Sequence, residues 1–341
     1  MDRGRAIRRL HLLCKAGKIS DLQSQALQGA IWERTGESGW PSDTDLHPWL
    51  FLELPGQEQA SELFHMNIIS AVSEGSVSHD LLMNLRIGLK VGGYLLDEAT
   101  LASCISACLD WVPPSMEGRS EFDVAMSGDT GLNRITAREI GEVLARTLLP
   151  KLDPQTIADS DIEARLTADE CYQRLPQLVA VAYQIERLFP EHASFALSLV
   201  RLALASRDPE RVYPAYVAIM QYIQETAFES QNSGAIVELL MHAIEQRTQP
   251  GLSSALQLVG DLVAAGRLSS ANQERIVAAL PALLEEYRYD QGRLEVPSLA
   301  DLPLVRKRVH RLASLLGKEY KLLDEITAKL SEDHLPEVRK Y

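Results

Sequence analysis

The amino-acid sequence predicts an all-α protein of stacked antiparallel helical hairpins, an α-solenoid of about fifteen helices. First, apolar residues recur three and four positions apart through most of the chain, which places them on one face of a helix. Second, no stretch alternates apolar and polar residues for long, and Asn-Gly or Asp-Gly hairpin turns do not occur. Third, only 6% of the residues are aromatic, while Leu, Ala, Glu, Gln and Arg are frequent, which favours helix over strand.

The breaks between the predicted helices are short and follow one pattern. Residues 17–20, 75–78 and 266–269 each begin with a glycine, which suits the left-handed position after a helix, and end with a serine, which suits the N-cap of the next helix. Gln23 stands three residues after Ser20, as a capping box requires. Because tight turns make consecutive helices antiparallel neighbours, the predicted local unit is a helical hairpin.

From about residue 190 onward the hairpins repeat. We expect 191–206 to pair with 209–228, 233–247 with 251–265, and 269–288 with 301–316, a step of roughly 40 residues. The string from Pro303 to Leu312 resembles the second helix of a HEAT repeat, and the string from Leu335 to Arg339 begins in the same way. This resemblance implies a helical-repeat architecture of the HEAT or armadillo type and no activity. We expect the last half-unit to be either a cap or an open end that docks on something else.

Two stretches rich in glycine and proline interrupt this rhythm, at residues 35–56 and 112–134. Loops longer than about 12–15 residues are commonly functional or disordered, so we expect irregular contact surfaces there. The resulting organisation is an N-terminal helical domain over 1–112 with a tryptophan-rich loop at 35–56, a loop or boundary at 113–133, and a C-terminal helical-repeat domain over 134–341.

Charge is unevenly distributed along the chain, whose net charge is −13. Residues 1–20 have a net charge of +5 and residues 301–341 one of +2, so the intervening residues hold −20. An acidic body repels phosphate backbones and anionic lipid, which argues against broad nucleic-acid or membrane binding and favours a protein partner with a basic surface. Arg306, Lys307, Arg308 and Arg311 form a local basic run, which is either the solvated side of a helix or a small nucleic-acid contact.

Four scattered cysteines are too few for a disulfide framework and indicate a reducing compartment. The basic opening is not followed by an uninterrupted apolar run, so no secretory signal is recognised. No apolar stretch approaches the roughly 20 residues of a membrane-spanning helix. We therefore expect a cytoplasmic protein.

Sequence motifs typical of metal-binding, cofactor-binding or catalytic sites are weak throughout the chain. Residues 128–139 have the length of a calcium-binding loop, but glycine, threonine and leucine occupy its first, third and fifth positions, where oxygen ligands are needed; a polar loop capped by Thr136 is the alternative. Cys104 and Cys108 lie one helical turn apart, yet two ligands do not make a zinc site, and core positions suit them better. Phosphate-binding and nucleophile motifs were not found. The sequence predicts no catalytic residue, no cofactor and no metal.

The tryptophans are the least random feature, because all four lie in the first third of the chain. Trp32, Trp40 and Trp49, with Phe51, could anchor a peptide or a partner helix, as tryptophan often does at interfaces. Alternatively, they pin the long loop onto the N-terminal hairpins. The stretch from Trp32 to Pro55 is similar to helical C-terminal regions attached to effectors of bacterial anti-phage systems, and this resemblance implies a defence setting.

The leading hypothesis is a non-enzymatic scaffold or adaptor in a cytoplasmic bacterial multi-protein assembly, with anti-phage defence as one setting. The predicted partner-binding residues are the four aromatic residues just named together with Arg306, Lys307, Arg308 and Arg311. Two alternatives stay open. One is a small-molecule sensor or enzyme with a pocket between helical domains near residues 112–134. The other is a nucleic-acid-associated protein that uses the basic run from Arg306 to Arg311.

Overall fold

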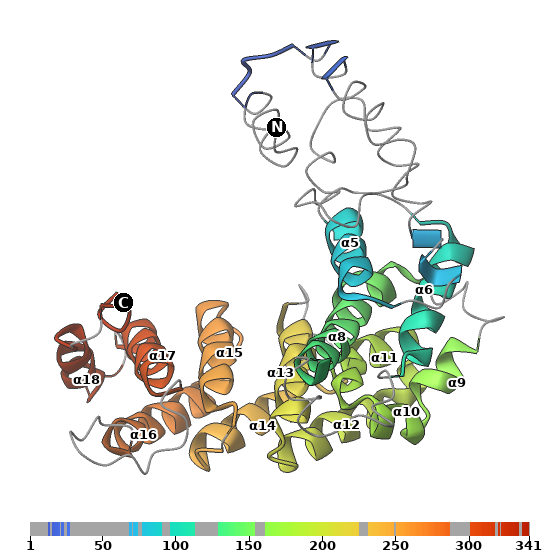
Figure 1. Ribbon diagram of the computed structural model, residues 1–341. Helices are drawn as coiled ribbons and strands as arrows, with labels where there is room; N and C mark the ends of the chain where they lie inside the picture. The colour runs from blue at the N-terminus through green and yellow to red at the C-terminus, as the bar shows by residue number, and fades with distance from the viewer. Residues whose placement is uncertain are drawn as a thin grey trace. The chain divides into compact units, whose positions relative to one another are not determined.

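A computed structural model provides the structure of the 341-residue chain (Figure 1). It describes residues 13, 16–20, 22–23, 26–27, 68–69, 71–73, 77–90, 96–112, 129–153, 161–224, 231–248, 250–286, 301–317, 320, 322–333 and 336–340. Every regular element within these ranges is helical, and none of them contains a strand, so the predicted all-α class is confirmed. The chain divides into two compact units, Met1–Leu175 and Pro176–Tyr341, which we call unit 1 and unit 2 and describe separately.

Within the described residues, unit 1 combines three longer helices with four short ones. Its described elements are α5 (His79–Lys90), α6 (Glu98–Asp110), α8 (Asp129–Val143), the π-helix η1 (Leu144–Leu148), the 3₁₀-helix η2 (Leu149–Lys151), α9 (Ile162–Leu166) and α10 (Asp169–Arg174). Helix α5 packs on α8, and α6 packs on η1 and α9. Two arginines link α9 and α10 to α6. Arg165 of α9 donates to Asp110, and Arg174 of α10 donates to the carbonyl oxygen of Leu109.

Residues 129–133, which belong to the predicted loop or boundary at 113–133, lie in a helix. Helix α8 begins at Asp129, so Thr136 lies inside a helix and does not cap one, which corrects that expectation. Helices on both sides of residues 113–133 pack together within unit 1, and the division between the two units falls after Leu175. The physical reason is burial: Ile140 and Leu144 supply an apolar surface that α5 and α6 cover.

Unit 2 is a regular succession of helices. Its elements are η4 (Pro176–Val181), α11 (Ala182–Leu188), η5 (Pro190–His192), α12 (Ala193–Ala205), α13 (Pro209–Gln224), α14 (Ser233–Glu245), α15 (Leu252–Ala264), α16 (Ser270–Glu286), α17 (Asp301–Leu316) and α18 (Leu322–Ser331). The three predicted hairpins are present as the packed pairs α12–α13, α14–α15 and α16–α17.

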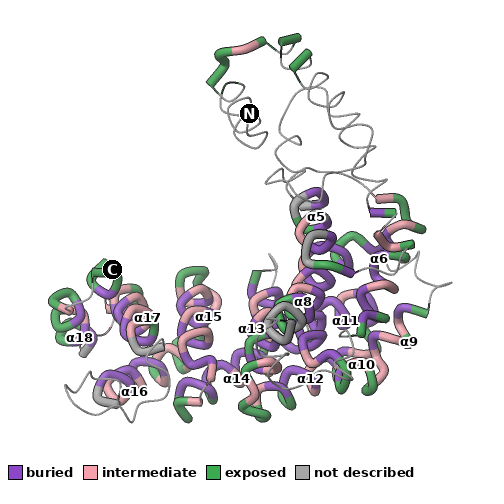
Figure 2. Tube along the Cα trace, in the orientation of Figure 1, coloured by how far each residue is buried: buried purple, intermediate pink, exposed green. Residues whose placement is uncertain are grey.

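Most helices of unit 2 also pack on the next but one. Helices α11, α13, α15 and α17 follow one another in contact, as do α14 and α16 in a second row (Figure 1). Buried positions run along both rows (Figure 2). This arrangement, in which contacts join only near neighbours, is compatible with a helical solenoid.

The predicted turn chemistry is confirmed where the structure describes it. Gly17 and Gly266 have φ values of 60° and 65°, in the left-handed region that favours glycine. The hydroxyl of Ser20 accepts from the amide of Gln23 at 3.3 Å, and the Gln23 side chain accepts from the Ser20 amide at 2.9 Å, which completes the capping box. Ser78 and Ser269 likewise accept amide hydrogen bonds from residues three positions later.

Candidate functional site

The candidate site lies on α17, where four of the eight predicted partner-binding residues are found. Arg306, Lys307, Arg308 and Arg311 all belong to this helix. Trp32, Trp40, Trp49 and Phe51 lie outside the described residues, so their predicted role stays a prediction.

Helix α17 is amphipathic, and its sequence explains which side is exposed. Val305, Val309, Leu312, Ala313 and Leu316 are buried and recur at spacings of three and four. At 100° per residue, Leu304, Lys307, Arg308, Arg311 and Leu315 share a second arc of the helix, and Arg308 lies at the edge of that arc next to the buried stripe. We call these five residues the α17 face.

Arg306 does not belong to this face. Its guanidinium forms a two-pronged ion pair with Asp333, with Nε 2.9 Å from Oδ2 and Nη2 3.1 Å from Oδ1, and both side chains are buried. The sequence analysis grouped Arg306 with a solvated basic run, and the structure instead buries it. The reason is Asp333, which follows α18 and supplies the matching charge inside the protein.

A second buried group fixes the same segment. His310 is fully buried, and its Nδ1 donates to the carbonyl oxygen of Val338 at 2.7 Å. Val338 is itself buried, and α18 places Leu323 and Leu330 in the core. Residues 322–333 and 336–340 therefore cover one side of α17 as a helix and a turn-rich segment, which is the behaviour expected of a capping unit.

The remaining arginines of the α17 face are held by α15. Arg308 donates to the side chain of Gln257 at 2.6 Å, and Arg311 donates to Asp261 at 2.8 Å. Both arginines are only partly buried, so their charge still reaches the surface. The contacts restrict their rotamers and hold the two guanidinium groups in one arrangement.

Both leucines of the α17 face are exposed to solvent. Leu304 is 41% exposed and Leu315 is 38% exposed, and they stand eleven residues apart on the same side of the helix. The cations lie between them. The α17 face is therefore a mixed surface, with an apolar residue near each end and positive charge in its middle.

Similar polar contacts link the other helices of the row. Gln184 of α11 donates to Gln221 of α13 at 2.8 Å, and Gln221 donates to the carbonyl oxygen of Ala180 at 3.0 Å. Arg267, just after α15, donates to the carbonyl oxygen of Ile223 on α13 at 2.9 Å. These bonds tie successive helices together and fix their register, which is a structural role.

Glu186 is a buried carboxylate of unit 2 whose contacts also indicate a structural role. One oxygen of Glu186 accepts from the hydroxyl of Tyr222 at 2.8 Å and from the amide of Asn232 at 2.6 Å. Burial, with the nearby charge of Glu186, raises the pKa of Tyr222, so its hydroxyl stays protonated and continues to donate. With its donors in place, this cluster links α11 to α13 and α14.

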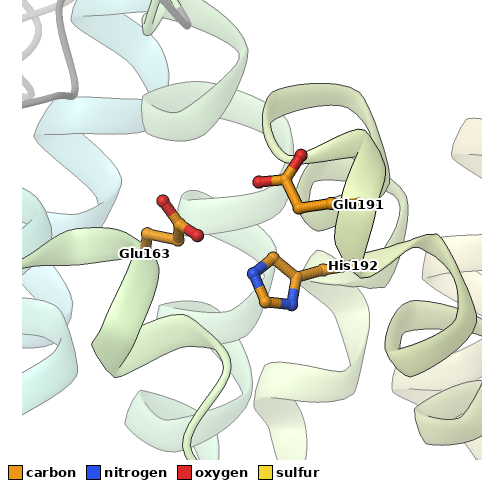
Figure 3. A group of neighbouring side chains, drawn as sticks. All are labelled: Glu163, Glu191 and His192. Atoms are coloured by element: carbon orange, nitrogen blue, oxygen red, sulfur yellow. The ribbon is translucent and has the colours of Figure 1, made fainter.

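Figure 3 shows three residues of metal-binding types, Glu163, Glu191 and His192. Glu163 belongs to α9 of unit 1, whereas Glu191 and His192 belong to η5 of unit 2. The ring of His192 packs edge-on against Phe189, with 6.4 Å between centroids. Within unit 2, Glu191 and His192 supply two ligands where structural zinc needs four, and we assign no metal to them.

Cys104 and Cys108 have a structural role. Cys104 and Cys108 are buried on α6, and desolvation raises the pKa of the Cys104 thiol to about 12 and that of Cys108 further. Both are free thiols, and the predicted core position is confirmed. A thiol held neutral in this way is a poor nucleophile and a poor metal ligand.

In the part of the chain that the structure describes, no helix is both long enough and apolar enough to cross a bilayer.

Sequence reasoning missed several residues that define the α17 face. Leu304 and Leu315 were not singled out, although a spacing of eleven places them on one side of a helix. The partners Gln257 and Asp261 precede Arg308 and Arg311 by 51 and 50 residues, an offset that the repeat of hairpins could have suggested. Asp333 has no such signal, because its pairing depends on how the chain turns after α18.

Compared with protein-family models, curated proteins and solved structures, this chain gives no significant match. Its architecture and function are therefore inferred from its own residues.

Proposed function

We propose that this protein is a non-enzymatic scaffold or adaptor that binds a protein partner through the helical hairpins of unit 2. The observation that carries the proposal is the succession of packed hairpins from α12 to α17, in which the extensive contacts of each described helix are with its near neighbours. Such stacks offer long, continuous surfaces to other proteins because successive repeats present equivalent positions side by side.

Two further features support a binding role. The polar contacts between α15 and α17 hold charged side chains in place before any partner arrives, which reduces the conformational entropy lost on binding. Exposed leucines accompany those charges on the α17 face, and a surface that combines the two is suited to a protein partner. The buried polar contacts between helices stabilise unit 2, and the proposed binding uses residues at its surface.

The proposed setting is the cytoplasmic bacterial multi-protein assembly predicted from the sequence. Unit 1 contains 26 acidic and 16 basic residues, whereas unit 2 contains 21 acidic and 18 basic residues. A partner with a basic surface, as the sequence analysis predicts, would therefore find its electrostatic complement mainly on unit 1. Unit 2, with a net charge of −3, complements the same partner surface more weakly.

Purification of the tagged full-length protein from the organism that encodes it tests this proposal. The lysate is treated with nuclease, and the proteins recovered are quantified by mass spectrometry. The proposal predicts a defined protein in stoichiometric amount that nuclease does not remove. Recovery of the chain alone, or of proteins that disappear with nuclease, would contradict it.

A further inference from the structure

We propose that residues 322–333 and 336–340, which we call the cap, form a lid that opens and closes over α17 as one unit while the other helices of unit 2 stay folded. In the closed position the cap covers the side of α17 that holds Arg306 and His310. Opening makes that side accessible to solvent. This inference goes beyond the proposed function, because it concerns access to α17 and does not depend on the identity of a partner.

The helix of the cap has fewer neighbours than the helices inside the stack. Helix α18 packs mainly on α17 and also on α16, whereas α15 packs on α13, α14 and α17 (Figure 1). Leu323, Ile326 and Leu330 form its buried stripe, at spacings of three and four residues. In a stack of helices the stability of each element depends on the interfaces with its neighbours. An element with fewer interfaces therefore needs less free energy to open than the whole unit needs to unfold.

Two polar contacts attach the two parts of the cap to α17. Arg306 forms its ion pair, at 2.9 and 3.1 Å, with Asp333, which follows α18 in the first part. The ring of His310 donates from Nδ1 to the carbonyl oxygen of Val338 in the second part, at 2.7 Å. Arg306 and His310 are four residues apart, so they lie on the same side of α17. The cap leaves that side only when both contacts break, and we therefore expect a single cooperative opening.

The buried ion pair makes the closed position specific and still allows the cap to open. In the closed position Arg306 and Asp333 have both lost water, and this loss offsets much of their attraction. Both groups regain water when the cap opens, so the pair adds little net free energy to closure. The pair selects one closed position, because a shifted cap would leave the buried guanidinium without its carboxylate. Closure itself depends on the few apolar side chains that the cap buries.

The side chain of His310 reports whether the cap is open or closed. The residue is fully buried, and its Nε2 lies 3.4 Å from the hydroxyl oxygen of Ser331 in α18. Since Nδ1 contacts Val338, the ring touches both parts of the cap. A reagent in solution therefore reaches the ring only after the cap opens. His242 on α14 is exposed in the same unit and provides an internal reference.

Chemical modification of the full-length protein measures this opening. Diethyl pyrocarbonate acylates accessible imidazoles, and mass spectrometry follows the modification of each histidine with time. We expect His310 to react at least about a hundredfold more slowly than His242, because it reacts only in the open state. Asp333→Asn removes the charge that pairs with Arg306 and should accelerate the modification of His310 by about tenfold or more. Asp324→Asn makes the same change at an exposed position of α18 and should leave the rate unchanged.

Hydrogen exchange followed by mass spectrometry distinguishes opening of the cap from unfolding of unit 2. Ile326→Val shortens a buried side chain of α18, and Ile244→Val makes the same change in α14, which does not pack extensively on the cap. The amides of α18 should exchange about twofold to tenfold faster in Ile326→Val. They should exchange at an unchanged rate in Ile244→Val, because α14 stays folded when the cap opens. Faster exchange of the α14 amides in Ile244→Val verifies that this substitution destabilises its own helix.

Three results would overturn the inference. The first is modification of His310 as fast as that of His242, and the second is an equal effect of Asp324→Asn and Asp333→Asn on the rate at His310. The third is an equal increase in the exchange of the α18 amides in the two valine variants, which would mean that α18 opens only when unit 2 unfolds. The valine variants change no charge, so they test the inference even if Asp333→Asn does not fold. None of these results bears on the proposed function, which the recovery of a partner tests.

Discussion

Replacement of Gly251 by alanine should strongly destabilise the stack of unit 2. Gly251 precedes α15 with φ 106° and ψ 0°, a conformation that residues with a side chain rarely adopt. An added Cβ would lie 2.3 Å from Cε2 of Tyr216 and 3.1 Å from Cγ1 of Val212. Tyr216 is buried on α13, so its ring cannot swing into solvent to make room.

The expected magnitude follows from two separate costs. A residue held at an unfavourable φ costs about 1–3 kcal/mol, and overpacking a buried position costs a further 1–3 kcal/mol or so. Since a domain is stable by about 5–15 kcal/mol, Gly251→Ala should remove a large part of the stability of unit 2. Denaturant unfolding followed by far-ultraviolet circular dichroism measures the change.

Two other glycines provide controls within the same unit. Gly266 has a positive φ but no atom within 4 Å of an added Cβ, so Gly266→Ala should cost only about 1 kcal/mol. Gly234 lies in α14 with open space around it, and Gly234→Ala should be neutral or stabilise by up to about 1 kcal/mol. If Gly251→Ala were no less stable than Gly266→Ala, the packing of Tyr216 against the start of α15 would be wrong.

Two further predictions concern buried groups. Asp333→Ala leaves Arg306 buried without its carboxylate and should destabilise unit 2 by about 3–5 kcal/mol. Asp261→Ala removes a carboxylate from a part-exposed pair and should cost about 1 kcal/mol or less. Chemical denaturation compares the two variants, and equal losses of stability would refute the buried pairing. Desolvation raises the pKa of Cys104 from 9.0 to about 12 and raises that of Cys108 as well, so the unfolded thiols ionise first and the folded state should lose stability as pH rises above about 9. Both thiols should also resist a thiol reagent at pH 8 until the protein unfolds, and fast labelling of the folded protein would contradict their burial.

Local signals in the sequence were sufficient to predict much of unit 2. The glycine and serine of residues 266–269 each act on the backbone within a few residues, so the turn they form could be read directly. The three hairpins followed from apolar spacing, because the buried stripe of each helix is continuous in the sequence.

Contacts between residues far apart in the sequence explain the features that could not be predicted from it. Helix α8 extends back to Asp129 despite Gly131, because its packing against α5 outweighs the weak helix propensity of glycine. The burial of Arg306 depends on Asp333, 27 residues away, and no local rule predicts that pair. Leu304 and Leu315 are exposed because of how the helices pack. The spacing of apolar residues does not predict this exposure, because it does not distinguish an exposed leucine of a helix from a buried one.

Site-specific photocrosslinking in the organism that encodes the protein tests the central claim most directly. A benzophenone amino acid is placed at position 304 on the α17 face and, in a matched control, at position 202 on α12. The account predicts that illumination joins position 304 to one recurrent protein, and that position 202 gives no such adduct. A nucleic-acid adduct, equal adducts at both positions, or none at position 304 would contradict it.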